Sequence, residues 1–462
     1  MNKSTRREFL KQTSILAAGT VLAKNSFAVN LLSKQKIIIL GAGLSGLAAG
    51  KMLKENNYDV TILEARNRIG GRVFSHTFDA QNSNDSEDNI VIELGAEWIG
   101  KSHERLLALC KELNIELLNN QFDDRLIYDN KYFKPNEWDY SPEWKIKFEK
   151  IIKDYANYTE ADKKRLDKTD WWRFLMNNDI SQKDLDLREY ADSTDFGESI
   201  RFVSAYAALA EYAESDETNE MDYKAKGGNQ MIAKGLAEKI GYDNIKLGNK
   251  VVSVNYNNSE IKIICSDGTV YTCDKLICSL PTYSISKINW EPLLPLYKRD
   301  AIDQLQYCRI NKSATLFKDK FWKDESFSII TDTFSHYFYH ATKQQNNNKG
   351  VLISYAVGDK ADILARLKKE DREKVVAESL SSAFGNNVMD LIETNVNYYW
   401  GTDEYSKGAY ALYGKSQWFD VMPLLKEKVD NIYFSGEHVA DWQGFMEGAI
   451  NTGEEAAVQI MG

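Results

Sequence analysis

One stretch near the start of the chain, residues 36–64, constrains the fold more than any other. Lys36–Leu40 reads KIIIL, the continuous apolar run expected of a parallel strand buried on both faces. Three glycines of GAGLSG follow at Gly41, Gly43 and Gly46, and then a segment with helical composition. The first glycine allows a tight turn, the second lets the backbone approach a pyrophosphate, and the third lets helix and strand pack closely. The stretch therefore predicts an α/β, Rossmann-type domain that binds a dinucleotide at the helix N-terminus.

The residues after this helix identify the dinucleotide. Val60–Leu63 is predicted to be the second strand, and Glu64 ends it, where an acid accepts hydrogen bonds from ribose hydroxyls. A second glycine-rich, basic loop follows at once in Arg66–Arg72 (RNRIGGR). A nicotinamide dinucleotide does not need this loop. A long, buried FAD does, because backbone and arginines must approach both ends of its pyrophosphate. FAD is therefore the predicted cofactor.

The charge balance and composition exclude several other classes of protein. The 462 residues include 58 basic and 68 acidic side chains, and this net charge of −10 argues against a nucleic-acid partner. Hydrophobic residues make up 43% of the chain, so it can bury a large core and is not disordered as a whole. The five cysteines are too scattered for a disulfide framework, and the five histidines show no zinc spacing, so no metal site is predicted.

Residues 1–28 are typical of an export signal. Thr5–Lys11 (TRREFLK) contains a twin arginine, an apolar run extends from Ser14 to Ala23, and Ser26–Ala28 has the small residues of a cleavage site. The run is too short to span a bilayer, and no integral membrane segment is predicted elsewhere. We therefore expect export by the twin-arginine route to the periplasm. The alternative is an ordinary leader with two chance arginines.

The segment Glu64–Arg72 (EARNRIGGR) resembles the FAD-binding signature of the flavin-containing monoamine oxidase family. Further blocks resemble that family in the family's own order: Ile92–Gly100 (IELGAEWIG), Lys226–Gln230 (KGGNQ), Lys246–Val252 (KLGNKVV), Asn311–Ser313 with Phe321–Trp322, Trp400–Tyr410 (WGTDEYSKGAY) and Tyr433–Ala449 (YFSGEHVADWQGFMEGA). Protoporphyrinogen oxidases and carotenoid desaturases share the first block but match the later ones less well.

This resemblance implies how the chain is divided. A discontinuous FAD-binding domain would contain residues 34–100, 226–282 and 398–462. Residues 101–225 and 283–397 would form an α+β substrate-binding domain. The first of these pieces has helical spacing, as in SIRFVSAYAALAEYAE, and is expected to be a helical cap; the second contains strands such as GVLISYAV. The sequence leaves open whether the protein is a homodimer.

The glycine motif and the resemblance together place one set of residues around FAD: Gly41, Gly43, Ser45, Gly46, Glu64, Ala65, Arg66, Gly71, Arg72, Gly95, Ala96, Glu97, Trp98, Val251, Gly436, Glu437 and Met446. Glu437 is expected to bind the ribityl chain. The helix that begins at Met446 would aim its N-terminus at the flavin N1–C2 edge and stabilise the negative charge of reduced flavin. In some relatives a cysteine precedes the first cage aromatic and is joined to the flavin. Ala409 stands there in this chain, so FAD is expected to bind without a covalent bond.

A lysine in an apolar row is a candidate catalytic residue. In RINKSATLF a strand period of two puts Lys312 on one face with Ile310, Ala314 and Leu316. Such a lysine is either an edge residue that reaches solvent or a buried functional group. The resemblance implies the second: Lys312 would hydrogen-bond a water at flavin N5 and assist the reaction with oxygen.

Three aromatic residues complete the predicted catalytic set. Tyr410 and Phe445 fall on positions that resemble the family's aromatic cage, which brackets the amine in front of the flavin, and Trp400 resembles the tryptophan that lines the ring. Apolar walls disfavour the ammonium form of a substrate, and hydride leaves the neighbouring carbon only when the nitrogen lone pair is free. Ring faces also attract the cation before it loses its proton. Ordinary core packing is the alternative for these rings.

The resemblance implies oxidative deamination of a primary amine or polyamine, with O2 reduced to H2O2. L-amino-acid oxidases carry an arginine after the second flavin loop, whereas this chain has Glu97 there, so a free amine fits better. An acidic run could attract polyamines or could be a solvated helix end: Glu211, Glu214, Asp216, Glu217, Glu220 and Asp222. The remaining alternatives are an L-amino-acid oxidase, a flavin dehydrogenase or desaturase on a non-amine substrate, and a non-catalytic flavin-binding module.

Overall fold

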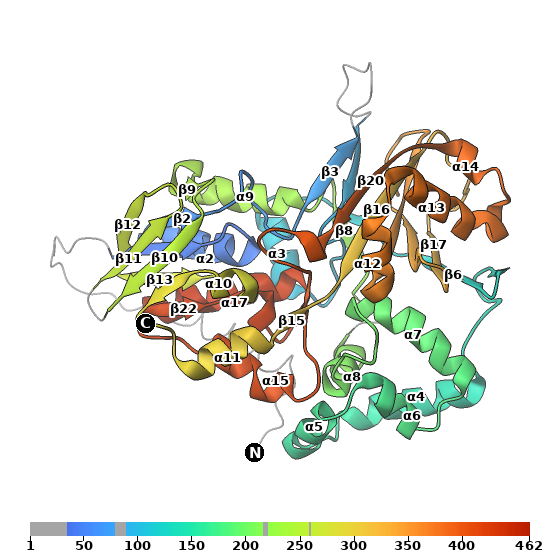
Figure 1. Cartoon of the computed structure of the whole chain (residues 1–462), viewed down its shortest axis with the longest axis horizontal. Coiled ribbons are helices and arrows are strands. Elements are labelled where there is room, and N and C mark those ends of the chain that lie inside the picture. The colour runs from blue at the N-terminus through green and yellow to red at the C-terminus, as the bar shows by residue number, and fades with distance from the viewer. Residues whose placement is uncertain (1–34, 79–88, 216–219, 258–259) are drawn as a thin grey trace.

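The computed structural model describes residues 35–78, 89–215, 220–257 and 260–462, and Figure 1 shows them as two lobes side by side. The predicted export signal at residues 1–28 lies outside the described residues. Within the described ranges no helix has both the length and the apolar character needed to cross a bilayer.

The first lobe is built on a five-stranded parallel sheet with strand order β22-β13-β1-β2-β9. Its strands are β1 (Lys36–Leu40), β2 (Asp59–Leu63), β9 (Ile245–Lys246), β13 (Lys275–Cys278) and β22 (Ile432–Phe434). Alternate side chains of β1 enter two different cores: Ile37 and Ile39 face one, while Ile38 and Leu40 face the other. Burial on both faces explains why this strand reads as an unbroken apolar run.

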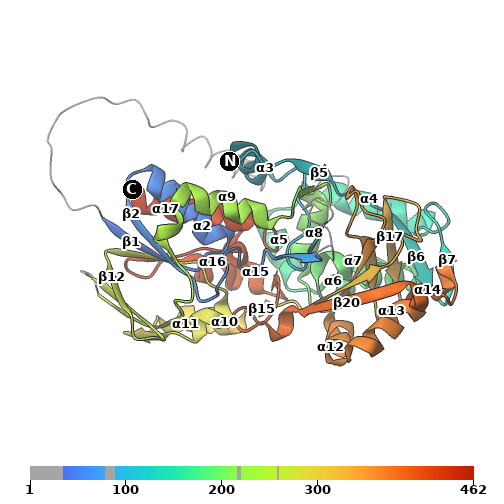
Figure 2. The same cartoon turned by 90° about the horizontal axis from the view of Figure 1, so that it is seen from above.

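Helices cover one face of this sheet, and a second sheet with further helices covers the other. The first layer consists of α2 (Leu44–Glu55), α3 (Glu104–Glu112), α9 (Gln230–Ile240) and α17 (Met446–Met461). The second layer consists of β10 (Val251–Tyr256), β11 (Ile261–Cys265), β12 (Val270–Cys273), β14 (Asn289–Glu291), α10 (Thr282–Ser286), α11 (Leu296–Gln304), α15 (Gln417–Asp420) and α16 (Met422–Lys426). Figure 2 shows these layers from above.

Helix α17, from the end of the chain, packs directly on α2, from its beginning. A Cβ on Gly453 would lie only 2.1 Å from the carbonyl oxygen of Ser45, so the two backbones could not approach this closely with a larger residue. The contact joins the first turn of α2 to the middle of α17. Residues at the start of each helix line one cavity, so both helix starts can act on one ligand.

The second lobe is built on a seven-stranded mixed sheet with strand order β20-β16-β19-β18-β17-β6-β7. Its strands are β6 (Asp123–Tyr128), β7 (Lys131–Phe133), β16 (Ile310–Phe317), β17 (Phe327–Thr331), β18 (Tyr337–His340), β19 (Gly350–Val357) and β20 (Ile392–Tyr399). Strand β16 lies between β20 and β19 and pairs antiparallel with both, so Lys312 is on a central strand and not at an edge.

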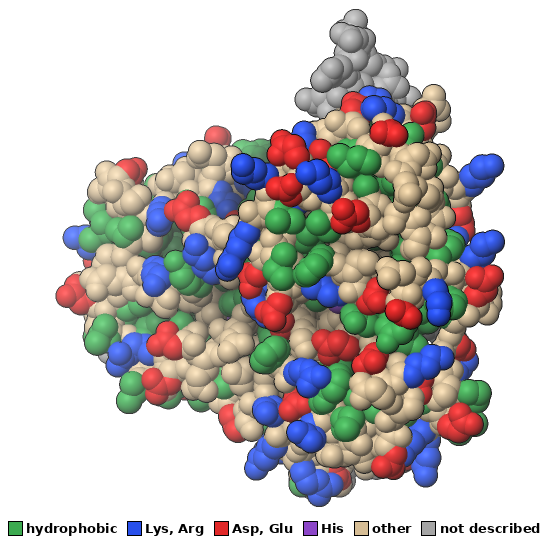
Figure 3. All heavy atoms as spheres, turned by 45° about the vertical axis from the view of Figure 1, so that its right-hand side comes forward, with side chains coloured by type: hydrophobic (Ala, Val, Ile, Leu, Met, Phe, Trp, Pro, Cys, Tyr) green, Lys and Arg blue, Asp and Glu red, His purple; other side chains and the backbone are tan. Residues whose placement is uncertain are grey.

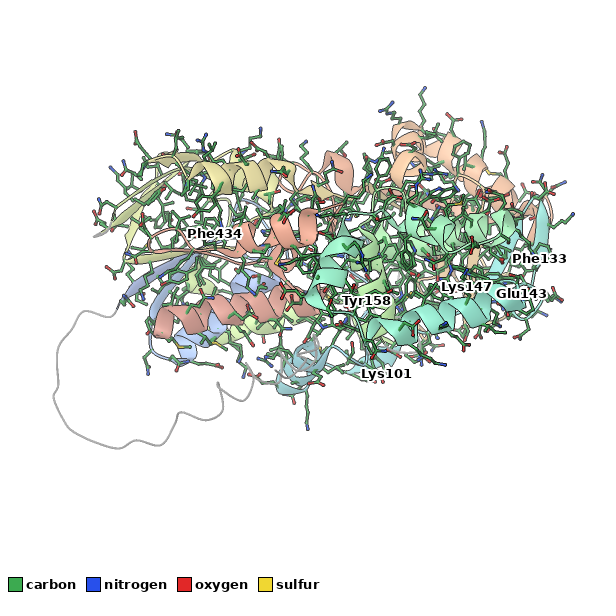
Figure 4. All side chains as sticks on the ribbon, turned by 90° about the horizontal axis from the view of Figure 1, so that it is seen from below. Lys101, Phe133, Glu143, Lys147, Tyr158 and Phe434 are labelled. Carbon is green, nitrogen blue, oxygen red and sulfur yellow. The ribbon has the colours of Figure 1, made fainter. Side chains whose placement is uncertain are left out.

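Two groups of helices cover this second sheet. One group is α12 (Gly358–Arg366), α13 (Lys369–Phe384) and α14 (Val388–Leu391). The other is α4 (Pro142–Tyr155), α5 (Glu160–Asp167), α6 (Trp171–Asn177), α7 (Gln182–Phe196) and α8 (Ala205–Glu214). Figure 4 shows α4 at the outside of the lobe, with Glu143 and Lys147 labelled on it. Three two-stranded ribbons complete the described chain: β3 (Ser75–Phe78) with β4 (Ile90–Glu93), β5 (Leu117–Asn119) with β8 (Tyr223–Ala225), and β15 (Gln306–Tyr307) with β21 (Ala411–Leu412).

The two pieces assigned to the substrate domain differ from expectation at their ends. Residues 101–225 are not a helical cap throughout, because α3 buries Leu106 and Leu109 in the core of the first lobe and β6 and β7 extend the seven-stranded sheet. Residues 283–305 likewise pack into the first lobe. The segment SIRFVSAYAALAEYAE is not one helix either. Helix α8 begins at Ala205, because the Ser204 side chain accepts hydrogen bonds from the first free N–H groups.

Candidate active site

A cavity of about 430 Å³ lies where the two lobes meet. Its wall combines the turn after β1, the end of β2, the loop after β4, strand β16 and the N-terminus of α17. Figure 3 shows that the molecular surface is hollowed between the lobes and that acidic and basic side chains are mixed over this face. The cavity therefore sits at the carboxyl ends of the parallel strands, where α/β sheets bind ligands.

The structure brings the predicted site residues together. All four predicted catalytic residues line the cavity, as do all the predicted cofactor-binding residues except Gly46. Gly46 lies just beneath the turn, where a Cβ would be 2.0 Å from the carbonyl oxygen of Gly41. A Cβ on Gly43 would instead meet no atom within 4 Å. The open space at Gly43 is at a helix N-terminus, which suits a pyrophosphate.

Glu64 is held by the backbone around this turn. Its carboxylate accepts hydrogen bonds from the N–H groups of Ala42 and Arg66, both at 2.8 Å. Burial raises the pKa of Glu64, and these two N–H bonds oppose the rise. The Arg66 side chain forms an ion pair of 2.7 Å with Asp403. Glu64 is thus fixed at the position predicted for a ribose contact.

Glu437 has protein partners as well as a place on the cavity wall. It forms an ion pair with Arg72 and accepts hydrogen bonds from the N–H groups of Gly444 (2.9 Å) and Ala411 (3.2 Å). Burial alone would raise the pKa of this carboxyl, but Arg72 and the N–H bonds hold it below its usual value. Its predicted bond to the ribityl chain stays a prediction.

Two buried polar atoms on the cavity wall have no hydrogen-bond partner among the residues that the structure describes. They are the indole nitrogen of Trp98 and the amide oxygen of Gln443. Buried polar groups are nearly always paired, so a donor and an acceptor left over in one cavity indicate a bound polar ligand. Together with the open space at Gly43 and the paired Glu64, they show that these residues fit FAD.

Lys312 is 2% exposed and points into the same cavity. Its ammonium group donates to the carbonyl oxygens of Glu93 (3.2 Å) and Gly95 (2.8 Å) and lies 3.6 Å from Oε2 of Glu97. Burial lowers the pKa of Lys312, and the charges of Glu97 and Glu93 oppose this. Lys312 is therefore buried and does not reach solvent at a sheet edge, while its role beside the flavin stays a prediction.

Each of the three predicted aromatic residues is held in place by a contact with a residue outside the predicted catalytic set. The Tyr410 hydroxyl donates to the backbone carbonyl of Asp195. The Phe445 ring meets the ring of His103 edge-on, with centroids 5.0 Å apart. The Trp400 indole N–H donates to the carbonyl of Leu94 at 2.9 Å. Because Tyr410 and Phe445 both face the cavity from fixed positions, they can bracket a substrate.

Of two acids on the cavity wall, Asp195 was not predicted from the sequence and Glu211 was noted only as part of an acidic run. Asp195 lies near the end of α7, and no motif marks it, because only the packing of α7 brings it here. Glu211 belongs to the acidic run already noted, and it lines the cavity while being 7% exposed. The alternative that this acidic run is a solvated helix end is wrong for Glu220 and Asp222, because both are fully buried. Asp216 and Glu217 lie outside the described residues.

Comparison with known proteins identifies the family of this chain. The family model "Flavin containing amine oxidoreductase" matches residues 44–461. Human amine oxidase [flavin-containing] B is 26% identical over 93% of this chain and 86% of its own length. Probable polyamine oxidase 4 of Arabidopsis thaliana is 29% identical over 94% of this chain and 91% of its own.

Solved structures share the fold. Putrescine oxidase, solved with putrescine bound, superposes with a TM-score of 0.80 at 21% identity, covering 93% of this chain and 99% of the other. Cyclohexylamine oxidase from Brevibacterium oxydans IH-35A gives 0.81 at 21% identity, covering 92% and 98%. Because the family model covers nearly the whole described chain, the chain belongs to the flavin-containing amine oxidoreductases and is an FAD-dependent enzyme that oxidises amines.

Proposed function

We propose that the preferred substrates are diamines or polyamines and that O2 is the acceptor. The amine loses two electrons and two protons to become an imine, and O2 takes up two electrons and two protons to become H2O2. FAD, when bound, carries the two electrons between these half-reactions. The observation that carries the substrate class is the pair of acids, Asp195 and Glu211, in the same cavity as Lys312 and the aromatic cage.

The two acids lie close to the cage. Burial raises the pKa of Tyr410, and the charges of Glu211 and Asp195 contribute to that rise. A substrate whose reacting amine lies between Tyr410 and Phe445 can therefore place a second ammonium group against these carboxyl groups. A monoamine of the same length has no second ammonium group to place there. Attraction in a cavity of low dielectric then favours the diamine.

The cavity is less suited to an amino acid. The arginines on its wall within the described residues are Arg66 and Arg72, and each already pairs with an acid, Asp403 or Glu437. Both lie with the predicted cofactor-binding residues and not with the cage. A substrate carboxylate would face Asp195 and Glu211 instead of a guanidinium. The names of putrescine oxidase and of the Arabidopsis polyamine oxidase relative support the same substrate class.

A peroxide-coupled assay of the purified yellow protein tests this proposal. It compares diamines, monoamines of equal length and L-amino acids, in the wild type and in Glu211→Gln. We expect the variant to lower the ratio of kcat/KM for diamine over monoamine by about tenfold or more, since a hydrogen bond to a charged group contributes about 1.5–3 kcal/mol. Glu214→Gln is the matched control: it lies three residues further along α8, bonds to Tyr155 and does not line the cavity. An unchanged ratio in Glu211→Gln, or faster turnover of amino acids, would contradict the proposal.

We also propose that the protein is exported by the twin-arginine route. The support is the segment TRREFLK followed by an apolar run and small residues. Changing Arg6→Lys and Arg7→Lys together is expected to keep the flavoprotein in the cytoplasmic fraction. Unchanged fractionation would mean that the two arginines have no such role.

A further inference from the structure

Glu97 is a second buried charge beside Lys312, and a contact with FAD is the only role so far expected for it. It is 3% exposed, and its Oε2 atom lies 3.6 Å from the ammonium nitrogen of Lys312. The Tyr339 hydroxyl donates to the same oxygen at 3.1 Å, and the Asn120 amide is 3.5 Å from the other oxygen. The carboxylate is therefore held between strand β18 and the lysine.

The hydrogen bonds of Lys312 to the backbone leave one N–H bond that can point toward Glu97. An ammonium group has three N–H bonds, and two of them go to the backbone carbonyls of Glu93 and Gly95. Three rings surround the group, with the ammonium nitrogen 5.5 Å from the Trp98 centroid and 5.6 and 5.8 Å from those of Tyr339 and Tyr355. Among the described residues, Glu97 is the acid whose carboxylate lies within 4.0 Å of the ammonium nitrogen.

We propose that Glu97 is a positioning residue for Lys312: its carboxylate orients the third N–H bond and keeps the lysine charged beside the flavin. The proposal rests on the placement of FAD argued above. A fully buried lysine without a partner loses its charge, whereas a carboxylate within 4 Å favours the charged form. An ammonium group next to the flavin would stabilise the negative charge that develops on oxygen as it is reduced.

The other titratable groups around Lys312 do not offer this partner at neutral pH. The Glu93 carboxyl accepts from Ser75 and from the Asn229 N–H, and burial, with the charge of Glu97 next, raises its pKa to about 8. Its carboxyl is therefore already held by partners other than Lys312. Lys224, from β8, donates to the carbonyl of Ala341 at 2.9 Å, and burial lowers its pKa.

The remaining groups are the tyrosines that face Lys312 from the sheet. Tyr355 and Tyr398 are its direct neighbours on β19 and β20, and Tyr339 lies on β18. Burial raises the pKa of each of them above its usual value, so each keeps its proton over the working range. Glu97 is thus the acid that governs the charge of Lys312 among the described neighbours.

The test measures the reoxidation and the reduction potential of the flavin and not the turnover of an amine. The protein is reduced with dithionite without oxygen and mixed with O2, and the reoxidation rate is measured from pH 6 to 10. The reduction potential of the bound flavin is measured over the same range as a second readout. Wild type is expected to show a pH midpoint, above which reoxidation slows and the potential falls, and Lys312→Met is expected to remove it.

Glu97→Gln is expected to move this midpoint to lower pH by about one unit or more, because an opposite charge at this distance shifts a pKa by about 1–3 units. Tyr339→Phe is the matched control: it removes the hydroxyl bond to Glu97 but keeps the carboxylate, so its midpoint should stay closer to wild type. In Lys312→Met the added Glu97→Gln change should have no further effect on the pH profile.

An unchanged midpoint in Glu97→Gln, or an equal slowing at every pH, would overturn the proposal. If that variant is recovered without flavin, Glu97→Asp replaces it. Its shorter side chain keeps the charge but withdraws it, so a smaller shift in the same direction is expected and an unchanged midpoint again overturns the proposal. Reduced wild-type flavin that does not react with O2 would instead contradict the proposed function, while the potential still reports on the pair.

Discussion

Lys312 and Lys298 are both buried lysines, and their surroundings separate a structural from a catalytic role. Lys298 donates to three carbonyl oxygens, those of Leu424 (2.9 Å), Leu425 (2.6 Å) and Glu427 (2.6 Å), and so completes the end of α16. Lys312 donates to two carbonyls and also faces a cavity. The sequence alone placed Lys312 equally well at a solvent edge, because the position of β16 in the sheet depends on strands far away in the chain.

We expect Lys312→Met to slow reoxidation of the flavin by O2 about a hundredfold or more, with a much smaller effect on reduction by amine. Losing one preorganised positive group beside developing negative charge commonly has an effect of this size. Stopped-flow measurement of the two half-reactions checks it. Lys298→Met is the control: it should lower the melting temperature, because three carbonyls lose their donor, but leave the reoxidation rate unchanged. Equal losses in both half-reactions of Lys312→Met would indicate a structural lysine.

A second residue, Asp195, is expected to make substrate preference depend on pH. Burial, and after it the neighbouring Asp192, raises the pKa of Asp195 to about 8. Below that pH the side chain is protonated and neutral; above it the carboxylate attracts a second ammonium group. The ratio of kcat/KM for diamine over monoamine should therefore rise as the pH increases through about 8, since kcat/KM reports on the free enzyme. Measuring the ratio from pH 6.5 to 9.5 checks this, and Asp195→Asn should make the profile flat. A flat profile in wild type would exclude a role for this charge.

At the scale of elements, the turn between β1 and α2 was predictable, because binding a dinucleotide requires the glycines and the acid at a fixed spacing along the chain. The apolar strand, the three glycines and Glu64 are local in sequence, and the structure has β1 at Lys36–Leu40 and α2 at Leu44–Glu55. The partners of an element were not predictable in the same way. Helix α3 has an apolar face, but nothing in its sequence says that this face packs in the first lobe. The burial of Glu220 and Asp222 was missed for the same reason, since their surroundings come from other segments.

Two glycines of this turn should respond differently to the same change. Gly43→Ala places a methyl group in open space at a backbone φ of −74°, so folding should be unaffected while FAD binds more weakly. Gly46→Ala places its methyl group 2.0 Å from the Gly41 carbonyl oxygen, so the turn and the helix must separate and stability should fall. FAD titration together with denaturant unfolding of the apo-protein separates the two outcomes. If both variants lose stability to the same extent, the open space at Gly43 is not the pyrophosphate site.

At the scale of the whole molecule, the cofactor site joins the two lobes, because its wall takes residues from both. A ligand that binds only the folded state stabilises it according to its concentration and affinity. Tight retention of FAD would therefore follow from the many polar contacts of Glu64, Arg66, Arg72 and Glu437 and would not by itself indicate a covalent bond. The question of a covalent bond is decided by which nucleophiles reach the cavity.

We expect the flavin to be released when the protein is denatured with acid. Ala409 lines the cavity directly before Tyr410 and has no nucleophile, and all five cysteines are buried away from the cavity wall. The backbone N–H of Cys308 donates to the carbonyl of Tyr410, but its Sγ is directed at the carbonyl of Phe196 at 3.2 Å. Burial also raises the pKa of that thiol well above its usual value, so little thiolate is available to attack. After acid precipitation and centrifugation the yellow colour should appear in the supernatant as free FAD. Colour that stays with the pelleted wild type but not with Cys308→Ser would identify that thiol as the attachment point, and colour that stays with both would place another side chain at the flavin.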